Sequence, residues 1–309
     1  MKRVVLSLLL LVIGIGGYAQ NDRLPELPAE NFNFMVASDM GRRGKSEQKN
    51  IAEIMGHFVE KNRIDFLAVA GDPIHDNGVR SVDDEEWKLK IENVYTAPSL
   101  HAIPWNVVAG NHEYNGNVQA VLDYSKVSER WHAPARYYSF TRKIGAGNNY
   151  CLFVFLDTTP LIDQYRNRAD VGKQDMEREL RWLDSVLMVS NARWKIVIGH
   201  HPVYAHTTKA AHERTDMQAR VGTILENRGA DFYICGHIHN FQHIKPEGKN
   251  VNYIVNSSAS QSREVAPIEG TIFCNPDPGY SAFTISANSV LFFFVNHKGT
   301  TVYRQVIEK

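Results

Sequence analysis

The fold of this chain is decided by the stretch Phe66-Leu67-Ala68-Val69-Ala70-Gly71-Asp72-Pro73-Ile74-His75. The apolar run at its start is short, uncharged and flanked by polar residues, which is typical of a buried strand. Such a strand would deliver Asp72 and His75 to the edge of a sheet. Taken alone, Asp72 before Pro73 is better explained as an ordinary loop start.

Four other apolar segments also run into polar residues. Residues 34–38 lead to Asp39, 105–109 to Asn111 and His112, 196–198 to His200 and His201, and 232–235 to His237 and His239. Parallel strands bring their carboxyl ends to one sheet edge, where ligands bind, so we expect these side chains to meet at one edge. Each of them has an ordinary interpretation as a turn residue, but five such endings in succession favour a shared site.

The ordered motifs resemble those of the calcineurin-like metallophosphoesterases, within them the purple acid phosphatases, and most closely the small tartrate-resistant type. The motifs are Asp39-Met40-Gly41, Gly71 to His75, Gly110 to Glu113, Gly199 to Pro202 and Gly236 to His239. The likeness extends from about Asn33 to the C-terminus. It implies a four-layer α/β/β/α sandwich of two mixed sheets flanked by helices, whereas the periodicity alone gives only the α/β class.

The resemblance also implies a centre of two metal ions, iron and/or zinc or manganese, with Asp72 bridging them. The first ion would be held by Asp39, Asp72, His75 and His239, and the second by Asp72, Asn111, His200 and His237. Oxygen and imidazole ligands suit these metals, and two cations about 3.5 to 4 Å apart activate water and neutralise charge on a phosphoryl group. His112 would stabilise or protonate the leaving oxygen.

Three further histidines are candidates for substrate binding. The Gly-His-x-Pro motif selects His200 as the ligand and leaves His201 to packing or to contacts behind the ligands. His206 and His212 lie in the following loop, where the family often places a substrate-facing histidine.

His75 departs from the purple enzymes, which have an iron-binding tyrosine at the corresponding position. A phenolate favours ferric iron and gives the colour, and a neutral imidazole removes that negative charge. We therefore hypothesise a site for two divalent ions, or for iron held less firmly as ferric, with a less acidic pH optimum.

The N-terminal residues have the pattern of a secretory signal peptide. Met1-Lys2-Arg3 precedes an apolar run from Val4 to Ala19, which is shorter than the roughly 20 residues that a spanning helix needs. We expect residues 1–20 to be removed and residues 21–309 to form a single metallophosphoesterase domain, exported to a periplasm or secreted, without stable membrane insertion. Without Lys2 and Arg3, the 34 basic residues become 32 against 34 acidic ones, so nothing suggests the basic stripe of a nucleic-acid-binding protein.

The segments between the motifs predict an alternation of helices and strands. We expect helices from a cap at Ser46, over about 84–100 and over 175–189, and adjacent strands over 137–144 and 150–156. The four β-rich segments at the C-terminus predict a separate antiparallel sheet over 251–256, 280–286, 290–296 and 301–307.

These observations favour an exported hydrolase of phosphoric ester bonds, of acid phosphatase type, acting on small phosphate monoesters. A phosphodiesterase or nucleotidase on the same site is the alternative, because the ligands act on any phosphoryl group while loops select its substituents. A catalytically silent protein that binds metal or phosphate is a third interpretation, against which the intact ligand set argues. The sequence leaves the oligomeric state open.

Overall fold

The computed structural model describes residues 24–145, 147–209 and 211–309. Two seven-stranded sheets lie in the described part of the chain. The first has the order β14-β13-β12-β1-β2-β3-β4 and the second the order β11-β9-β10-β8-β7-β6-β5. Parallel and antiparallel pairs occur in both sheets, so both are mixed, as the resemblance implied.

The strands have the following bounds. The first sheet contains β1 (Phe32–Ala37), β2 (Phe66–Ala70), β3 (Trp105–Val108), β4 (Trp131–His132), β12 (Gly279–Ile285), β13 (Ser289–Asn296) and β14 (Thr301–Glu308). The second contains β5 (Tyr138–Lys143), β6 (Tyr150–Phe155), β7 (Trp194–Ile198), β8 (Phe232–Cys235), β9 (Phe241–Ile244), β10 (Asn252–Val255) and β11 (Thr271–Asn275).

A core of aromatic side chains joins the two sheets face to face. Phe34 of β1 stacks on Phe283 of β12 with ring centroids 4.7 Å apart, and it meets the edge of Phe153 of β6 at 5.3 Å. Phe66 of β2 also contacts Phe153, at 5.1 Å. Because these rings are buried and interlock across both sheets, they fix how the strand ends of one sheet face those of the other.

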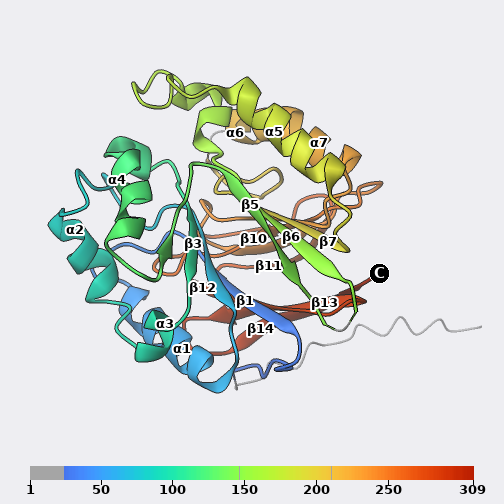
Figure 1. Ribbon diagram of the computed structural model, residues 1–309, viewed down its shortest axis with the longest axis horizontal. Helices are drawn as coiled ribbons and strands as arrows, with labels where there is room; N and C mark the ends of the chain where they lie inside the picture. Colours follow the sequence, from blue (N-terminus) through green and yellow to red (C-terminus); the bar gives the residue numbers. More distant parts are fainter. Residues whose placement is uncertain (1–23, 146, 210) are drawn as a thin grey trace, which may run out of the picture.

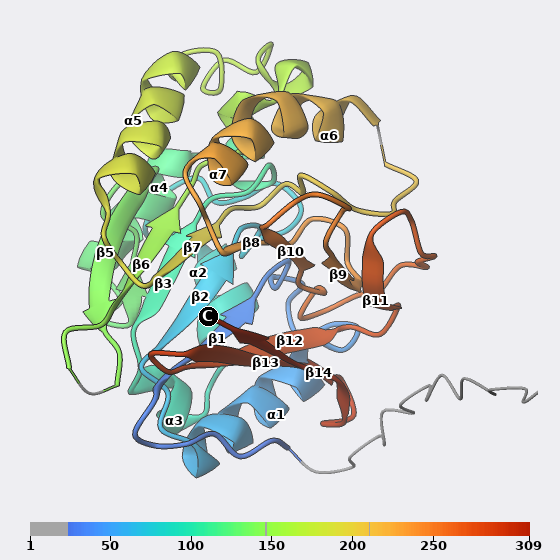
Figure 2. The ribbon, with the colours of Figure 1, turned by 90° about the vertical axis from the view of Figure 1, so that its right-hand side faces the viewer.

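Helices cover the outer faces of both sheets (Figures 1 and 2). Helices α1 (Gln48–Lys61) and α3 (Pro98–His101) lie on the first sheet, and α5 (Met176–Val189), α6 (Ala211–Met217) and α7 (Thr223–Asn227) lie on the second. Helix α1 packs through an apolar stripe, since Ile51, Met55 and Phe58 are fully buried. The four layers are therefore the α/β/β/α sandwich. No helix in the described part of the chain combines the length and apolar character needed to cross a membrane.

Two expectations about the helices are wrong. The segment expected as one helix over 84–100 is divided into α2 (Glu85–Trp87), a π-helical turn (Lys88–Glu92) and α3, because Pro98 disfavours helical backbone at Ala97. Ser46 does not cap α1: its φ is 55°, in the left-handed region, and the helix begins after Glu47. Helix α4 (Val118–Asp123) begins after Asn117, whose side chain accepts a hydrogen bond from the Ala120 amide.

The C-terminal strands do not form a separate sheet. Strands β12, β13 and β14 extend the first sheet, because β12 pairs antiparallel with β1. Strand β10 instead joins the second sheet, where it lies parallel to β8. The single ligand edge expected from the sequence is wrong for the same reason: β1, β2 and β3 belong to one sheet, whereas β7 and β8 belong to the other.

Candidate metal centre

The backbone turns sharply at four of the predicted ligands. Asp39, Asp72, His237 and His239 have φ angles of 52°, 50°, 70° and 65°, all in the left-handed region that few residues other than glycine adopt. Such conformations cost on the order of 1 to 3 kcal/mol each and persist where the surrounding structure imposes them. These turns direct the side chains that follow β1, β2 and β8 into the junction between the two sheets.

Two glycines of the motifs allow the loops to approach one another. A Cβ atom on Gly110 would lie 2.2 Å from Asp72 Oδ1, and one on Gly236 would lie 2.5 Å from the side chain of Ser38 and 2.6 Å from Asp39 Oδ2. A larger residue at either position would therefore displace a predicted ligand. The missing side chain of Gly236 lets the loops of the two sheets approach each other, and that of Gly110 lets the loop after β3 approach the loop after β2.

The first predicted ligand set comes together around Asp39. His239 Nε2 lies 3.0 Å from Asp39 Oδ1, and His75 Nε2 lies 3.7 Å from the same oxygen and 3.5 Å from Asp72 Oδ2. The ligand atoms of Asp39, His75 and His239 are all within 4.8 Å of one another, which is close enough to share one ion.

The second set comes together around Asp72 and His200. His200 Nε2 lies 3.1 Å from Asp72 Oδ2, and His237 Nδ1 lies 3.2 Å from His200 Nε2. A ligand oxygen of Asp72 lies close enough to ligand atoms of Asp39 and His200 to share one ion with them. Asp72 also lies close enough to His75 and His112 to share an ion with that pair. This shared position is the one predicted for the bridging carboxylate.

The donor atoms fit a metal centre. Both ring nitrogens of His75 and the side-chain oxygen of Asn111 are buried and have no hydrogen-bond partner among the described residues. A buried polar atom without a partner is rare and costs free energy, so its presence here indicates a ligand at the site. The predicted set supplies imidazole nitrogens and carboxylate or amide oxygens, which suit iron, zinc or manganese. The assignment of each residue to a particular ion stays a prediction.

The electrostatics favour ionised carboxylates and mostly neutral imidazoles. Burial alone would raise the pKa of Asp72, but the charge of His200 and its hydrogen bond hold this pKa well below its usual range, and the contact with His239 does the same for Asp39. Burial lowers the pKa of His75 to about 3 and lowers that of His237 well below its ordinary value. In His200 the carboxylate of Asp72 outweighs burial and raises the pKa to about 9, so a metal ion would displace a proton from this ring.

His112 lies at the accessible side of the centre. Its Nδ1 is 2.6 Å from the carbonyl oxygen of Asp76, which fixes the ring, and its Nε2 is 3.8 Å from Asp72 Oδ2. Its side chain is 27% exposed, whereas that of His75 is 1% exposed. His112 is therefore the imidazole that a substrate can reach.

The three histidines predicted to bind substrate have different surroundings. His201 is buried beside His200 and His237, its Nδ1 lies 2.8 Å from Thr158 Oγ1, and its Nε2 has no partner among the described residues. His206 Nδ1 accepts a hydrogen bond from the Ala266 amide at 3.1 Å, and His212 Nε2 lies 2.6 Å from Gln164 Oε1. Among the described residues, neither His206 nor His212 belongs to a group of potential metal ligands, and their role in substrate binding stays a prediction.

Two glutamates support the ligand loops. Glu113 accepts hydrogen bonds from the amides of Gly110 at 2.7 Å, Asp72 at 3.1 Å and Ile74 at 3.0 Å, so it ties the loop after β3 to the loop after β2. Glu213 of α6 lies 3.0 Å from His237 Nε2 and fixes the orientation of that ring. Glu113 could have been found in the sequence, because it closes the motif that contains Asn111; nothing in the sequence marks Glu213.

Sequence reasoning also missed a lysine at the centre. Lys209 Nζ lies 2.8 Å from the carbonyl oxygen of His237 and 3.2 Å from each nitrogen of its ring. The guanidinium of Arg263 reaches the same carbonyl oxygen at 3.3 Å. Burial and the charge of Arg263 lower the pKa of Lys209 to about 8. Lys209, on the loop that leads to α6, is only four residues before Glu213, which lies in the first turn of that helix.

Comparisons with known proteins agree with this geometry. The family of calcineurin-like phosphoesterases matches residues 32–241. Purple acid phosphatase 4 of Arabidopsis thaliana is 33% identical over 248 residues, which cover 76% of this chain and 70% of that protein. Tartrate-resistant acid phosphatase type 5 of Homo sapiens is 32% identical over 224 residues, covering 69% and 66%.

Solved structures share the fold. GAP50, described as the anchor in the inner membrane complex of Plasmodium, has a TM-score of 0.78 at 23% identity and covers 90% of this chain and 89% of its own. Purple acid phosphatase PPD1 from yellow lupin (Lupinus luteus) seeds has a TM-score of 0.64 at 15% identity and covers 90% of this chain and 53% of its own. At these identities the structures show the fold alone. The sequence match over most of the chain shows more: this protein belongs to the calcineurin-like phosphoesterases, hydrolases of phosphoric ester bonds, with purple acid phosphatases among its relatives.

Proposed function

We propose that this protein is an exported phosphatase that hydrolyses phosphate monoesters at a dinuclear metal centre, with iron, zinc or manganese as its ions. The observation that carries the proposal is the position of Asp72, whose carboxylate is shared between the group around His75 and the group around His200. When bound, two metal ions supply an activated water and neutralise the charge of the transferring phosphoryl group.

The residues of the chain hold the metal ions in position and supply a proton. Asp39 and Asp72 are ionised and buried, so their charges are available to hold cations. The His112 ring donates its Nδ1 hydrogen to the Asp76 carbonyl oxygen, and its Nε2 lies on the side of Asp72, 3.8 Å from Oδ2. A protonated His112 can donate from Nε2 to the leaving oxygen of the ester, and this is the general-acid role that we propose for it.

Lys209 supports a phosphate monoester over a diester. Its ammonium group lies beside His237, a predicted metal ligand, and a metal ion there would repel it unless an anion lay between them. A phosphate monoester carries between one and two negative charges near neutral pH, because its second pKa is about 6, whereas a diester carries one. The extra positive charge of Lys209 therefore favours the more highly charged substrate.

A direct assay tests the proposal. Purified protein should hydrolyse p-nitrophenyl phosphate with a larger kcat/KM than bis-p-nitrophenyl phosphate. Asn111→Ala and His237→Ala should abolish turnover and lower metal content, whereas His57→Ala, which changes an exposed histidine of α1, should alter neither. A larger kcat/KM for the bis ester would make the protein a phosphodiesterase, and unchanged turnover in Asn111→Ala would refute the metal assignment.

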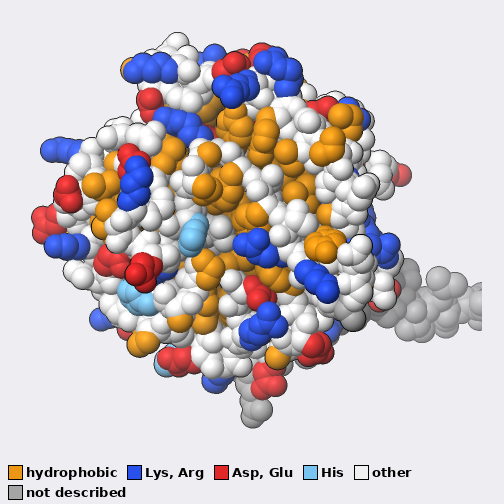
Figure 3. All heavy atoms as spheres, viewed as in Figure 1, with side chains coloured by type: hydrophobic (Ala, Val, Ile, Leu, Met, Phe, Trp, Pro, Cys, Tyr) orange, Lys and Arg blue, Asp and Glu red, His pale blue; other side chains and the backbone are white. Residues whose placement is uncertain are grey.

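Export and domain organisation belong to the same proposal. The predicted signal peptide, residues 1–20, lies outside the described residues. We propose that it is removed and that the rest of the chain acts as one domain on a small substrate rather than on nucleic acid. On the face shown in Figure 3, Lys and Arg side chains are interspersed with Asp and Glu, which supports a small substrate. Mass spectrometry of the exported protein would give the cleavage position, and an intact N-terminus would contradict removal.

A further inference from the structure

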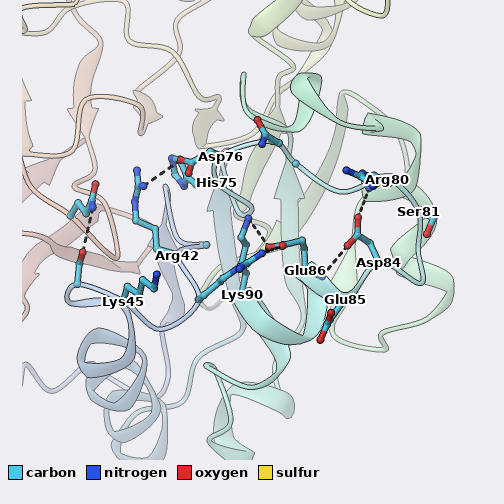
Figure 4. A pocket seen from close by; sticks show the side chains of 16 residues that line it. Arg42, Lys45, His75, Asp76, Arg80, Ser81, Asp84, Glu85, Glu86 and Lys90 are labelled. Carbon is cyan, nitrogen blue, oxygen red and sulfur yellow. Dashed lines mark hydrogen bonds and ion pairs between the residues drawn. The ribbon is translucent and has the colours of Figure 1, made fainter.

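A cavity of about 850 Å³ opens beside the metal centre. It lies between the loop that follows β1, the loop that follows β2 and the segment from Asp84 to Lys90 (Figure 4). His75 belongs both to the wall of this cavity and to the predicted ligand set. Asp76, whose carbonyl oxygen accepts a hydrogen bond from the accessible His112, also lines the cavity. A substrate whose phosphoryl group lies beside His112 would therefore have this cavity next to it for the rest of its structure.

The wall of the cavity is built from polar residues, charged residues and glycine. None of its lining residues, all of which are described, is hydrophobic, and the charged ones carry both signs. Glu86 binds the guanidinium of Arg43 and also Lys90 Nζ, the latter at 2.8 Å, so this side of the wall is held by an ionic network (Figure 4). Ligand pockets are usually lined mainly by apolar side chains, so the composition of this one indicates a particular class of ligand.

Arg42 is the charged residue of this wall with an unmet hydrogen-bonding group. Its side chain is 19% exposed, and its Nη1 is 3.5 Å from Asp76 Oδ1, the outer limit of a hydrogen bond. Its Nε is buried and has no partner among the described residues. Nε itself is closed to the cavity. The Nη end of the guanidinium borders His75 and Asp76 on the wall and is held, within the described part of the chain, only by the 3.5 Å contact, so it could donate to an acceptor oxygen of a bound ligand.

Hydroxyl groups match a wall of this kind. A hydroxyl donates one hydrogen bond and accepts others, so it can pair both with arginine and lysine donors and with carboxylate acceptors. An alkyl or aryl group would remove water from the charged side chains without replacing its hydrogen bonds, which is unfavourable. Resting on the proposed function, we infer that this cavity binds the alcohol half of the substrate and that this alcohol is hydroxyl-rich, as in a sugar phosphate, with Arg42 as a specificity-determining residue.

Two substrates with closely related scissile bonds test whether the protein recognises the hydroxyl groups of the alcohol. Glucose 6-phosphate and n-hexyl phosphate are both six-carbon esters of a primary alcohol, and they differ chiefly in the hydroxyl groups and ring. The wild-type protein should have a kcat/KM at least tenfold larger for glucose 6-phosphate. Arg42→Ala should lower the value for glucose 6-phosphate about tenfold, mainly through KM, and change that for hexyl phosphate less than threefold. Arg42→Lys should restore part of the loss.

The controls distinguish failure of this inference from failure of the proposed function. Arg142→Ala, which changes an exposed arginine of β5, should leave both values unchanged, and the metal content of Arg42→Ala should equal that of the wild type. Hydrolysis of p-nitrophenyl phosphate without a preference for glucose 6-phosphate, or an equal loss on both esters in Arg42→Ala, would overturn the inference alone. A protein that hydrolyses none of the three esters would overturn the proposed function and this inference with it.

Discussion

His200 Nε2 lies 3.1 Å from Asp72 Oδ2, and this contact joins the two sheets. Asp72 follows β2 of the first sheet, and His200 follows β7 of the second. Neither sheet alone contains a complete ligand set, because His237 and His239 also come from the second sheet and Asp39 and His75 from the first. The centre therefore depends on how the sheets are packed, as well as on the residues themselves.

Asp72→Asn should remove the link between the two ligand groups. An amide offers one oxygen and no negative charge, so it cannot bridge two cations as a carboxylate does. We expect metal content to fall from two ions toward one or none and kcat to fall by more than about 100-fold. Metal analysis by mass spectrometry and p-nitrophenyl phosphate hydrolysis would measure both, with Asp83→Asn as an exposed control. Two ions bound to Asp72→Asn with wild-type affinity would contradict the bridging role.

Glu213→Gln should weaken metal binding without removing a ligand. Glu213 lies 3.0 Å from His237 Nε2, and a carboxylate behind a ligating histidine orients the ring and increases its basicity. Loss of such a partner typically costs 10- to 100-fold in metal affinity or activity, and we expect about that here. Competition with a chelator would measure the affinity. Tyr165→Phe, which removes the 2.6 Å hydrogen bond to the other oxygen of Glu213, should have a smaller effect. Equal affinities for Glu213→Gln and wild type would exclude a positioning role.

Lys209→Met should reduce the preference for monoesters. The substitution keeps the length of the side chain and removes its charge, which we place beside the substrate phosphate. We expect kcat/KM for p-nitrophenyl phosphate to fall about tenfold and that for the bis ester to fall less, while inhibition by inorganic phosphate weakens. Arg263→Ala tests the second cation at the same carbonyl oxygen. A loss of the same size on both esters would show that Lys209 does not distinguish their charges.

His75→Tyr should give the iron-loaded protein a strong absorption band in the visible region. The wild type has an imidazole with two unpartnered nitrogens at this position, so we expect no strong visible band from it. A tyrosine here would place a phenolate beside Asp39 and Asp72, where charge transfer to ferric iron gives colour. Visible absorption spectra of the wild type and of His75→Tyr, both loaded with iron, would test this prediction. A purple wild-type protein would refute the hypothesis of two divalent ions.

His243 should make the fold sensitive to acid independently of the metal centre. It is buried between Tyr303 and Asn252, and burial lowers its pKa from 6.5 to about 4. The unfolded chain therefore takes up a proton between about pH 6.5 and pH 4 that the folded protein does not, so this contribution to stability is complete above pH 6.5 and is lost as the pH falls. The shift corresponds to about 3 kcal/mol.

Urea unfolding at pH 7 and pH 4 would measure this contribution. His243→Gln should show a smaller decrease in unfolding free energy between the two pH values than the wild type, by about 3 kcal/mol. His57→Gln, at an exposed position, should behave like the wild type. Identical pH dependence in His243→Gln and wild type would show that His243 is not responsible.

Several elements were predictable because their signals are local. Strand β2 lies where the apolar run from Phe66 to Ala70 placed it, and α5 begins at Met176 after Asp175, whose side chain accepts from the Arg178 amide at 2.9 Å. The interruption of the helix expected over 84–100 was not predictable in the same way, because the apolar residues of this segment pack against the first sheet from short separate helical turns. The assignment of β12 to the first sheet depends on its pairing with β1, whose Asn33 lies opposite Thr284, a contact between distant parts of the chain.

Which residues can carry the chemistry follows from the order of the amino acids alone. Six of the predicted ligands each follow an apolar strand within a short motif: Asp39, Asp72, Asn111, His200, His237 and His239. Both the strand and the turn depend on neighbouring residues. Only the tertiary structure decided that these motifs belong to two sheets, that Glu213 and Lys209 stand behind and beside His237, and that a hydrophilic cavity adjoins His75. The physical reason is that a side chain's type and its local backbone are encoded by adjacent residues, whereas strand pairing and side-chain contacts across the core depend on the packing of the whole chain.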